Sequence, residues 1–204
     1  MSDRPPPDRP LALAFAGPRG PVDALGGLTA ADFATRPAEA VRRAAAGVEA
    51  ARALALGPTL TAIAGRAVER DAGALSLGPD GLLGRAGDFP LVELAGSLLR
   101  GRCAVCGFGP LAEPEGHCPA CGGVVRPDAV LPDELVASRD RLAAEFVVGR
   151  AEAVVLVEVD SYPGAELLTR LAATHGKPMY HFRGSLEDLD AILPAALGAP
   201  SDAP

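Results

Sequence analysis

The sequence lacks tryptophan, has few aromatic side chains of any kind and carries no excess of positive charge. Phe, Tyr and Trp make up 4% of its 204 residues, which leaves few rings on which single-stranded nucleic acid could stack. The formal net charge of −7 argues against a protein that binds phosphate backbones, because such proteins cluster Lys and Arg. We therefore expect no nucleic-acid partner.

Long apolar runs are also missing. No stretch of about 18 uninterrupted apolar residues exists, and the chain begins with MSDRPPPDRP, where a signal peptide would need an apolar core. We therefore expect no membrane contact and a cytoplasmic location. In a reducing cytoplasm, four cysteines in two close pairs are more often metal ligands than disulfides.

The cysteines form the most specific motif of the chain. Two Cys-x-x-Cys pairs are separated by eleven residues. Each such turn lets two thiolates converge on one ion, and four thiolates complete the tetrahedral set of structural zinc without leaving a position for a catalytic water. A redox dithiol or a pair of disulfides is the alternative, and His117 is expected to be an exposed neighbour. The predicted zinc ligands are Cys103, Cys106, Cys118 and Cys121.

Short apolar runs alternate with segments of helical periodicity. Strand, helix, strand and helix at these lengths predict right-handed crossovers and a parallel sheet. The expected fold class is therefore α/β, a Rossmann-like parallel sheet with helices on both faces and an inserted four-cysteine zinc ribbon. The expected strands are 11–16, 59–64, 91–94, 153–159 and 179–182, and the expected helices are 37–56, 134–148, 163–174 and one that opens at Ser185.

The same pattern divides the chain into a main domain, an insert and two ends. The Pro-rich start and the polar end are expected to be disordered. The expected divisions are a lead at 1–10, a Rossmann-like domain at 11–100 and 127–198, a zinc ribbon at 101–126 and a tail at 199–204.

Three stretches of the chain carry recognisable motifs. Leu91 to Gly107 reads LVELAGSLLRGRCAVCG, Cys118 to Val130 reads CPACGGVVRPDAV, and Ala153 to Ala165 reads AVVLVEVDSYPGA. They resemble the sirtuin family of NAD-dependent protein deacylases, whose motifs are VELHGSLxxxxCxxCG, CPxCGGxLRPDVV and a strand followed by GTSLxVxPA, the last in a shortened form here. The resemblance covers about Phe89 to Leu197 and implies a zinc ribbon inserted in a Rossmann-type sheet.

The departures from the family fall on its catalytic residues. The His of the family's ELHGS is the general base, and here that position is Ala95, whose methyl group cannot accept a proton. The family's phosphate loop reads GAGxS, whereas Leu13 to Gly20 reads LAFAGPRG and Pro18 removes an amide donor. The family's TQNxDGLH aligns loosely with Leu60 to Ala67, where its polar residues are absent. The resemblance thus implies a shortened and catalytically degenerate member without a catalytic residue.

The cofactor-binding candidates lie where the first and the longest strand end. Glu158 and Asp160 stand where the family places small hydroxyl residues. Two carboxylates there repel a diphosphate, or else they are solvated loop charges. We expect weak binding of NAD or ADP-ribose at most. The candidate residues are Gly17, Arg19, Asp160 and Ser161.

Three functions stay open at this point. The first is a sirtuin-like zinc-binding protein without deacylase activity, which binds or assembles with another protein. The second is an active NAD-dependent deacylase, which turns acyl-lysine and NAD into nicotinamide and O-acyl-ADP-ribose with other groups such as His181. The third places the function in the cysteine ribbon, as an interaction or redox element.

Overall fold

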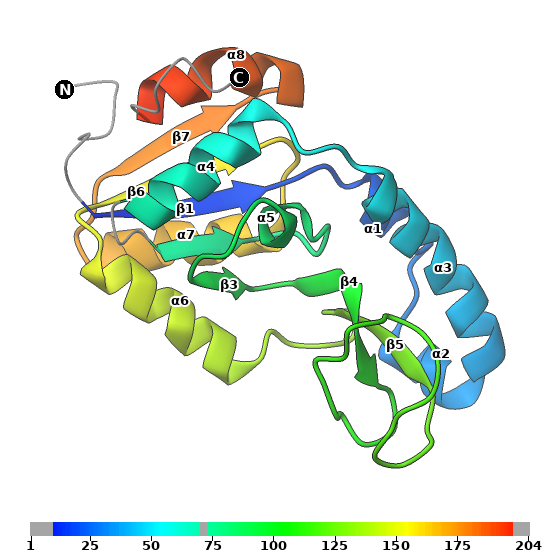
Figure 1. Ribbon diagram of the computed structural model, residues 1–204. Helices are drawn as coiled ribbons and strands as arrows, with labels where there is room; N and C mark the ends of the chain where they lie inside the picture. Colours follow the sequence, from blue (N-terminus) through cyan, green and yellow to red (C-terminus); the bar gives the residue numbers. More distant parts are fainter. Residues whose placement is uncertain (1–9, 70–72, 198–204) are drawn as a thin grey trace.

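Five parallel strands form the central sheet of the computed structural model, which describes residues 10–69 and 73–197 (Figure 1). The expected tail and all but the last residue of the expected lead lie outside these residues. The strand order β3-β2-β1-β6-β7 confirms the Rossmann-like parallel sheet predicted from the sequence. The strands are β1 (Leu11–Ala16), β2 (Gly73–Ser76), β3 (Leu91–Glu93), β6 (Ala153–Glu158) and β7 (Met179–Arg183).

Helices cover both faces of this sheet (Figure 1). Alternate side chains of a strand point to opposite faces, so Leu13 and Val155 join one core whereas Ala14 and Leu156 join another. The first core is closed by α4 (Pro58–Glu69), α5 (Leu82–Arg85) and α8 (Leu186–Leu197). The second is closed by α6 (Ser138–Arg150) and α7 (Pro163–Thr174).

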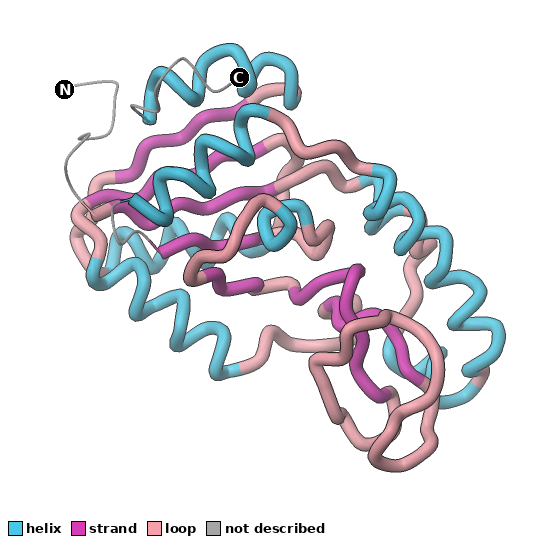
Figure 2. Tube along the Cα trace, viewed as in Figure 1, coloured by secondary structure: helices cyan, strands magenta, loops and turns pink. Residues whose placement is uncertain are grey.

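The remaining elements form a second lobe beside the sheet, as Figure 2 shows. Its core includes Leu28 and Phe33 from the helical segment and Leu98 and Leu131 from around the hairpin. The elements are α1 (Gly20–Asp23), α2 (Ala30–Thr35), α3 (Pro37–Ala53) and the antiparallel strands β4 (Gly96–Cys103) and β5 (Val125–Ala129).

Side chains cap the N-terminus of α2, and one of them comes from the chain that follows β5. The side chain of Thr29 accepts a hydrogen bond from the N–H of Asp32, and the Asp32 carboxylate accepts one from the N–H of Thr29. The carboxylate of Asp133 accepts further bonds from the N–H groups of Ala30 and Ala31, at 2.8 and 3.2 Å. These bonds lower the pKa of Asp133. The free N–H groups at the start of α2 are thereby satisfied by a carboxylate from the chain after β5, and this contact joins the helical part of the second lobe to the hairpin part.

The strand expected at 59–64 is wrong, since these residues belong to helix α4. Leu60, Ile63 and Ala67 are buried and recur at the spacing of a helix, and Pro58 suits a first helical turn. The second strand of the sheet is β2, only four residues long. The helix expected at 134–148 begins later, at Ser138, because the Glu134 carboxylate accepts the backbone N–H of Leu131 and holds this segment in a turn.

No described helix is both long and apolar enough to cross a membrane.

Replacing Leu13 with Ala tests the buried centre of the sheet. Leu13 is in the core on the α4 and α8 face, so the truncation leaves a cavity and lowers the free energy of unfolding by about 2–5 kcal/mol. Urea denaturation measures the change. The exposed Leu142→Ala variant is the control and should change stability by less than about 0.5 kcal/mol. An equal loss in both variants would contradict the assignment of Leu13 to the core.

Candidate functional site

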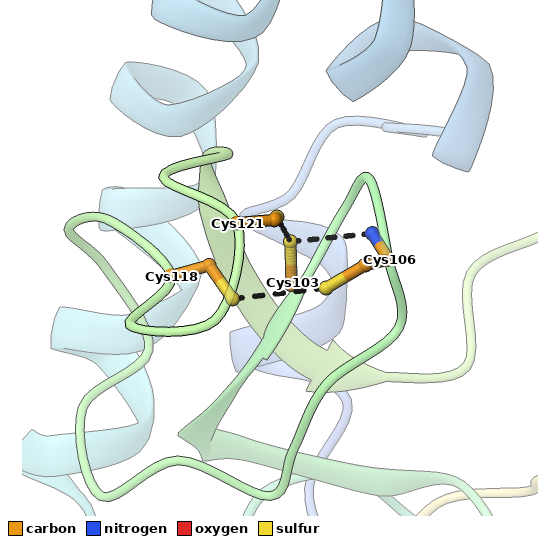
Figure 3. A group of neighbouring side chains, drawn as sticks. All are labelled: Cys103, Cys106, Cys118 and Cys121. Carbon is orange, nitrogen blue, oxygen red and sulfur yellow. Dashed lines mark hydrogen bonds between the residues drawn. The ribbon is translucent and has the colours of Figure 1, made fainter.

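The four cysteine sulfurs lie together at the end of the β4–β5 hairpin (Figure 3). Every pair of these atoms is within 4.8 Å; Cys103 and Cys121 are 3.5 Å apart, and Cys106 and Cys118 are 3.7 Å apart. A tetrahedral ion with metal–sulfur bonds of about 2.3 Å needs sulfurs about 3.8 Å apart. The cluster therefore fits a zinc ion, and the predicted ribbon is present.

The backbone around the sulfurs favours thiolates. The N–H of Cys106 points at the Cys103 sulfur over 3.4 Å and is the main reason that the pKa of Cys103 falls to about 6. The Gly123 N–H also acts to lower the pKa of Cys121, but hydrogen bonds with the neighbouring cysteines raise that pKa above its usual value.

Each turn closes on a glycine with positive φ, 73° at Gly107 and 72° at Gly122. Their N–H groups bond the carbonyls of Cys103 and Cys118 at 3.1 and 2.8 Å. The sequence thus supplies glycine where a side chain would strain the turn.

His117 lies outside the cluster. It is exposed, as expected from the sequence, and it pairs with Val124 through a single backbone bridge. Within residues 10–69 and 73–197, the side chains of His, Cys, Asp and Glu that lie close enough to share one ion are the four cysteines. Cys103 and Cys118 are buried, whereas the other two cysteines are exposed.

The cofactor-binding candidates meet at the carboxyl edge of the sheet. Gly17 and Arg19 follow β1, while Asp160 and Ser161 follow the neighbouring strand β6. The backbone N–H of Arg19 donates to the Asp160 carboxylate at 2.7 Å. The Arg19 guanidinium lies 5.9 Å from the ring centre of Tyr162. The Asp160 carboxylate therefore already accepts one of the backbone N–H groups of the loop after β1, and that N–H is not available to a ligand.

The Glu158 carboxylate is paired with side chains of β7 and is not a free charge beside the loop after β1. It is buried, and its Oε2 atom lies 2.8 Å from Nε2 of His181 and 3.3 Å from the guanidinium of Arg183. His181, which the sequence offers as a candidate catalytic group, has this carboxylate as its partner. The pair lies between β6 and β7, on the far side of β6 from β1.

Sequence reasoning missed Asp80. The segment from the end of β2 into α5, Ser76 to Leu83, reads SLGPDGLL, which matches the sirtuin motif TQNxDGLH at its Asp, Gly and Leu. The alignment to Leu60–Ala67 was therefore wrong, because a strand had been placed on helix α4. The family's Asp is present as Asp80. The positions of its Gln, Asn and His hold Leu77, Gly78 and Leu83.

Asp80 is a buried carboxyl group beneath the loop after β1. Its Oδ1 accepts the N–H of Leu82 at 2.9 Å, and its Oδ2 has no hydrogen-bond partner among the described residues. A Cβ atom at Gly17 would lie 2.5 Å from Oδ2, so only glycine fits between the carboxyl and the loop. Burial raises the pKa of Asp80 to about 6.

A cavity of about 560 Å³, hereafter the interlobe cavity, separates the sheet edge from the second lobe. Ala95 lies on its wall, in the turn between β3 and β4, and the Ala95 carbonyl accepts the N–H of Val130 at 2.9 Å. Arg19 lines the same cavity, as do Leu77 and Tyr162. The position at which the family carries its general base thus opens into this space.

Asp80→Asn tests the effect of the buried carboxyl on stability. Because the folded-state pKa is raised, the protonated form stabilises the fold, and that contribution is lost as the pH rises through about 6. Asn stays neutral at every pH. The free energy of unfolding of the variant, relative to that of the unsubstituted chain, should therefore rise by about 1–2 kcal/mol between about pH 5 and pH 7.5. Denaturation at each pH measures this difference.

Asp88→Asn is the matched control for this experiment, because Asp88 is exposed. The difference in the free energy of unfolding between this variant and the unsubstituted chain should stay constant over the same pH range. A flat difference for Asp80→Asn as well would show that the carboxyl titrates normally and is not desolvated.

Curated relatives match part of this chain, while no family model matches it. An NAD-dependent protein deacylase of Thermus thermophilus is 45% identical over 82 residues, which are 38% of this chain and 32% of the relative. An NAD-dependent protein deacetylase of Cutibacterium acnes is 35% identical over 104 residues, 47% of this chain and 42% of the relative. The chain therefore matches less than half the length of these relatives.

Solved structures of Sir2 proteins share the fold over nearly the whole chain. An ADP-ribose complex of a Sir2 homologue mutant superimposes with a TM-score of 0.72 at 18% identity, over 96% of each chain. Sir2Tm bound to a propionylated peptide gives 0.71 at 16% identity, over 94% of each chain. The chain therefore has the fold of the Sir2 structures, and over the matched segments it is similar to NAD-dependent protein deacylases; the four-cysteine cluster lies on this shared fold.

Proposed function

We propose that this chain is a zinc-binding sirtuin-like protein without deacylase activity, which acts by binding and not by catalysis. The observation that carries the proposal is Ala95, on the cavity wall where the family's motif has the general base. A methyl group cannot take a proton from a ribose hydroxyl, whatever its surroundings.

The loop after β1 supports the same proposal. A diphosphate is held by backbone N–H groups that point at it, and here Pro18 has none while Arg19 donates its own to Asp160. NAD or ADP-ribose would have to displace this carboxylate or bind beside it, against charge repulsion. Binding of either nucleotide is therefore weak.

We also propose that zinc has a structural role in an insert at 101–126. The buried apolar contacts near the cysteines are few, since Cys103, Cys118 and Val125 form the small cluster there. Metal binding to four thiolates contributes on the order of 10 kcal/mol to the folding of such ribbons. The ion takes the place of the hydrophobic core that this segment lacks.

The competing function is an active NAD-dependent deacylase. The names of the matched relatives favour it, and so does Asp80, which keeps the aspartate of the family's motif. It needs another general base near Ala95. His181 is held by Glu158 at the β6–β7 end of the sheet and is not among the residues that line the interlobe cavity.

A deacylation assay separates the two functions. Zinc-loaded protein with NAD and acetyl-lysine peptide should release no nicotinamide above the rate without protein, while an active sirtuin assayed alongside does. Calorimetry should detect weak ADP-ribose binding at most, and Asp160→Gly should strengthen it by about tenfold because the Arg19 N–H is freed. NAD-dependent turnover by the unsubstituted chain would refute the proposal.

Metal analysis tests the cysteine cluster. We expect one zinc ion per chain, and we expect Cys106→Ser to lose the metal and to melt at a lower temperature, since one of four ligands is gone. His117→Ala is the control and should keep the zinc, because His117 is exposed and outside the cluster. Purified protein that contains disulfides and no zinc would support the redox alternative instead.

A further inference from the structure

The walls of the interlobe cavity are mostly aliphatic. They come from the segment around α1 and α2, from the ends of β2 and β3, and from the chain after β5. Ala95 adds a methyl group where an imidazole would make the wall polar. Representative lining side chains are Val22, Leu28, Leu77, Leu94, Leu131 and Leu167.

The interior of this cavity offers few polar contacts to a ligand. None of the described lining side chains has a buried polar atom without a hydrogen-bond partner. The Glu134 carboxylate, which also lines the cavity, is already bound by the Arg126 guanidinium and by the N–H of Leu131. A sugar or a phosphate placed inside would bury its own polar groups without partners, at a cost in affinity. The occupant that fits has an apolar body.

The remaining charged groups of the lining are Arg19 and Asp23. Their side chains are 50% and 65% exposed, and their closest charged atoms are 3.7 Å apart. An exposed pair at this distance contributes little, so the guanidinium can exchange Asp23 for another carboxylate. Arg19 is the cation among the lining residues. A guanidinium–carboxylate pair is strong when two N–H groups of the guanidinium bond the two carboxylate oxygens.

We propose that the interlobe cavity binds a medium-chain fatty carboxylate, with its aliphatic chain inside and its carboxylate on Arg19. The volume of about 560 Å³ lies within the range of roughly 300–1,000 Å³ that is typical of small-molecule sites. The inference goes beyond the proposed function, because the loss of deacylase chemistry requires no ligand of any kind.

Calorimetry with decanoate, below its micelle concentration and on zinc-loaded full-length protein, tests the site. We expect saturable binding of one molecule per chain. Ala95→Leu places three more carbons in the cavity and should weaken binding by about tenfold or more. Ala46→Leu makes the same change at an exposed position of α3 and should leave the affinity unchanged. Thermal melting and zinc content show whether each variant is folded.

Two further variants test the head group. Arg19→Gln should weaken decanoate and leave decanol unaffected, whereas Asp23→Asn should strengthen decanoate because it removes the competing carboxylate. The Asp23 variant keeps the test decisive if Ala95→Leu does not fold. The proposal is overturned if millimolar decanoate shows no saturable binding, or if folded Ala95→Leu binds as well as the unsubstituted chain. Equal affinities for decanol and decanoate would also overturn it.

Discussion

The parallel pairing of β1 with β6 is the constraint on which the rest of the structure depends. The two strands run in register from Leu11 beside Ala153 to Ala16 beside Glu158, and both are buried along their whole length. Parallel strands end at the same edge, so the loops that follow them must meet. That is why Arg19 and Asp160, 141 residues apart in the chain, share a hydrogen bond. The order of the parallel strands thus produces a crevice at this edge, whatever residues line it.

The residues that fill this crevice change what it can do. Asp160 accepts a backbone N–H of the loop after β1, and Ala95 lies at the cavity wall, where the sirtuin motif has a histidine. Asp80 remains, buried between the sheet edge and Gly17 with its pKa raised. Asp160 and Ala95 are the basis of the proposal that the crevice holds an apolar ligand and does not activate a hydroxyl. Its shape is that of the Sir2 fold, and its chemistry depends on a few residues that differ from the sirtuin motifs.

The sequence predicted those features whose cause is local. Cys-x-x-Cys pairs with glycine behind them specify their turns by themselves, and the apolar run at 153–159 is a buried strand in almost any context. The segment from Pro58 failed because Leu60, Ile63 and Ala67 follow a helical spacing that the short run TLTAIA hides. That one error shifted the alignment and concealed Asp80. The interlobe cavity was beyond sequence reasoning, since its walls come from segments that only the fold brings together.

The cysteine cluster and the interlobe cavity are mechanically connected. β4 leaves the turn that holds Ala95 and ends at Cys103, so the strand that supplies a zinc ligand also starts at the cavity wall. Leu25, Leu28 and Leu131 line the cavity and belong to the second-lobe core, which packs on Leu98 of the same strand. An ion that orders the hairpin therefore also holds one wall of the cavity in place. Under the proposed function, the zinc site would thus serve ligand binding, because a binding cavity between two lobes depends on both lobes being held in place.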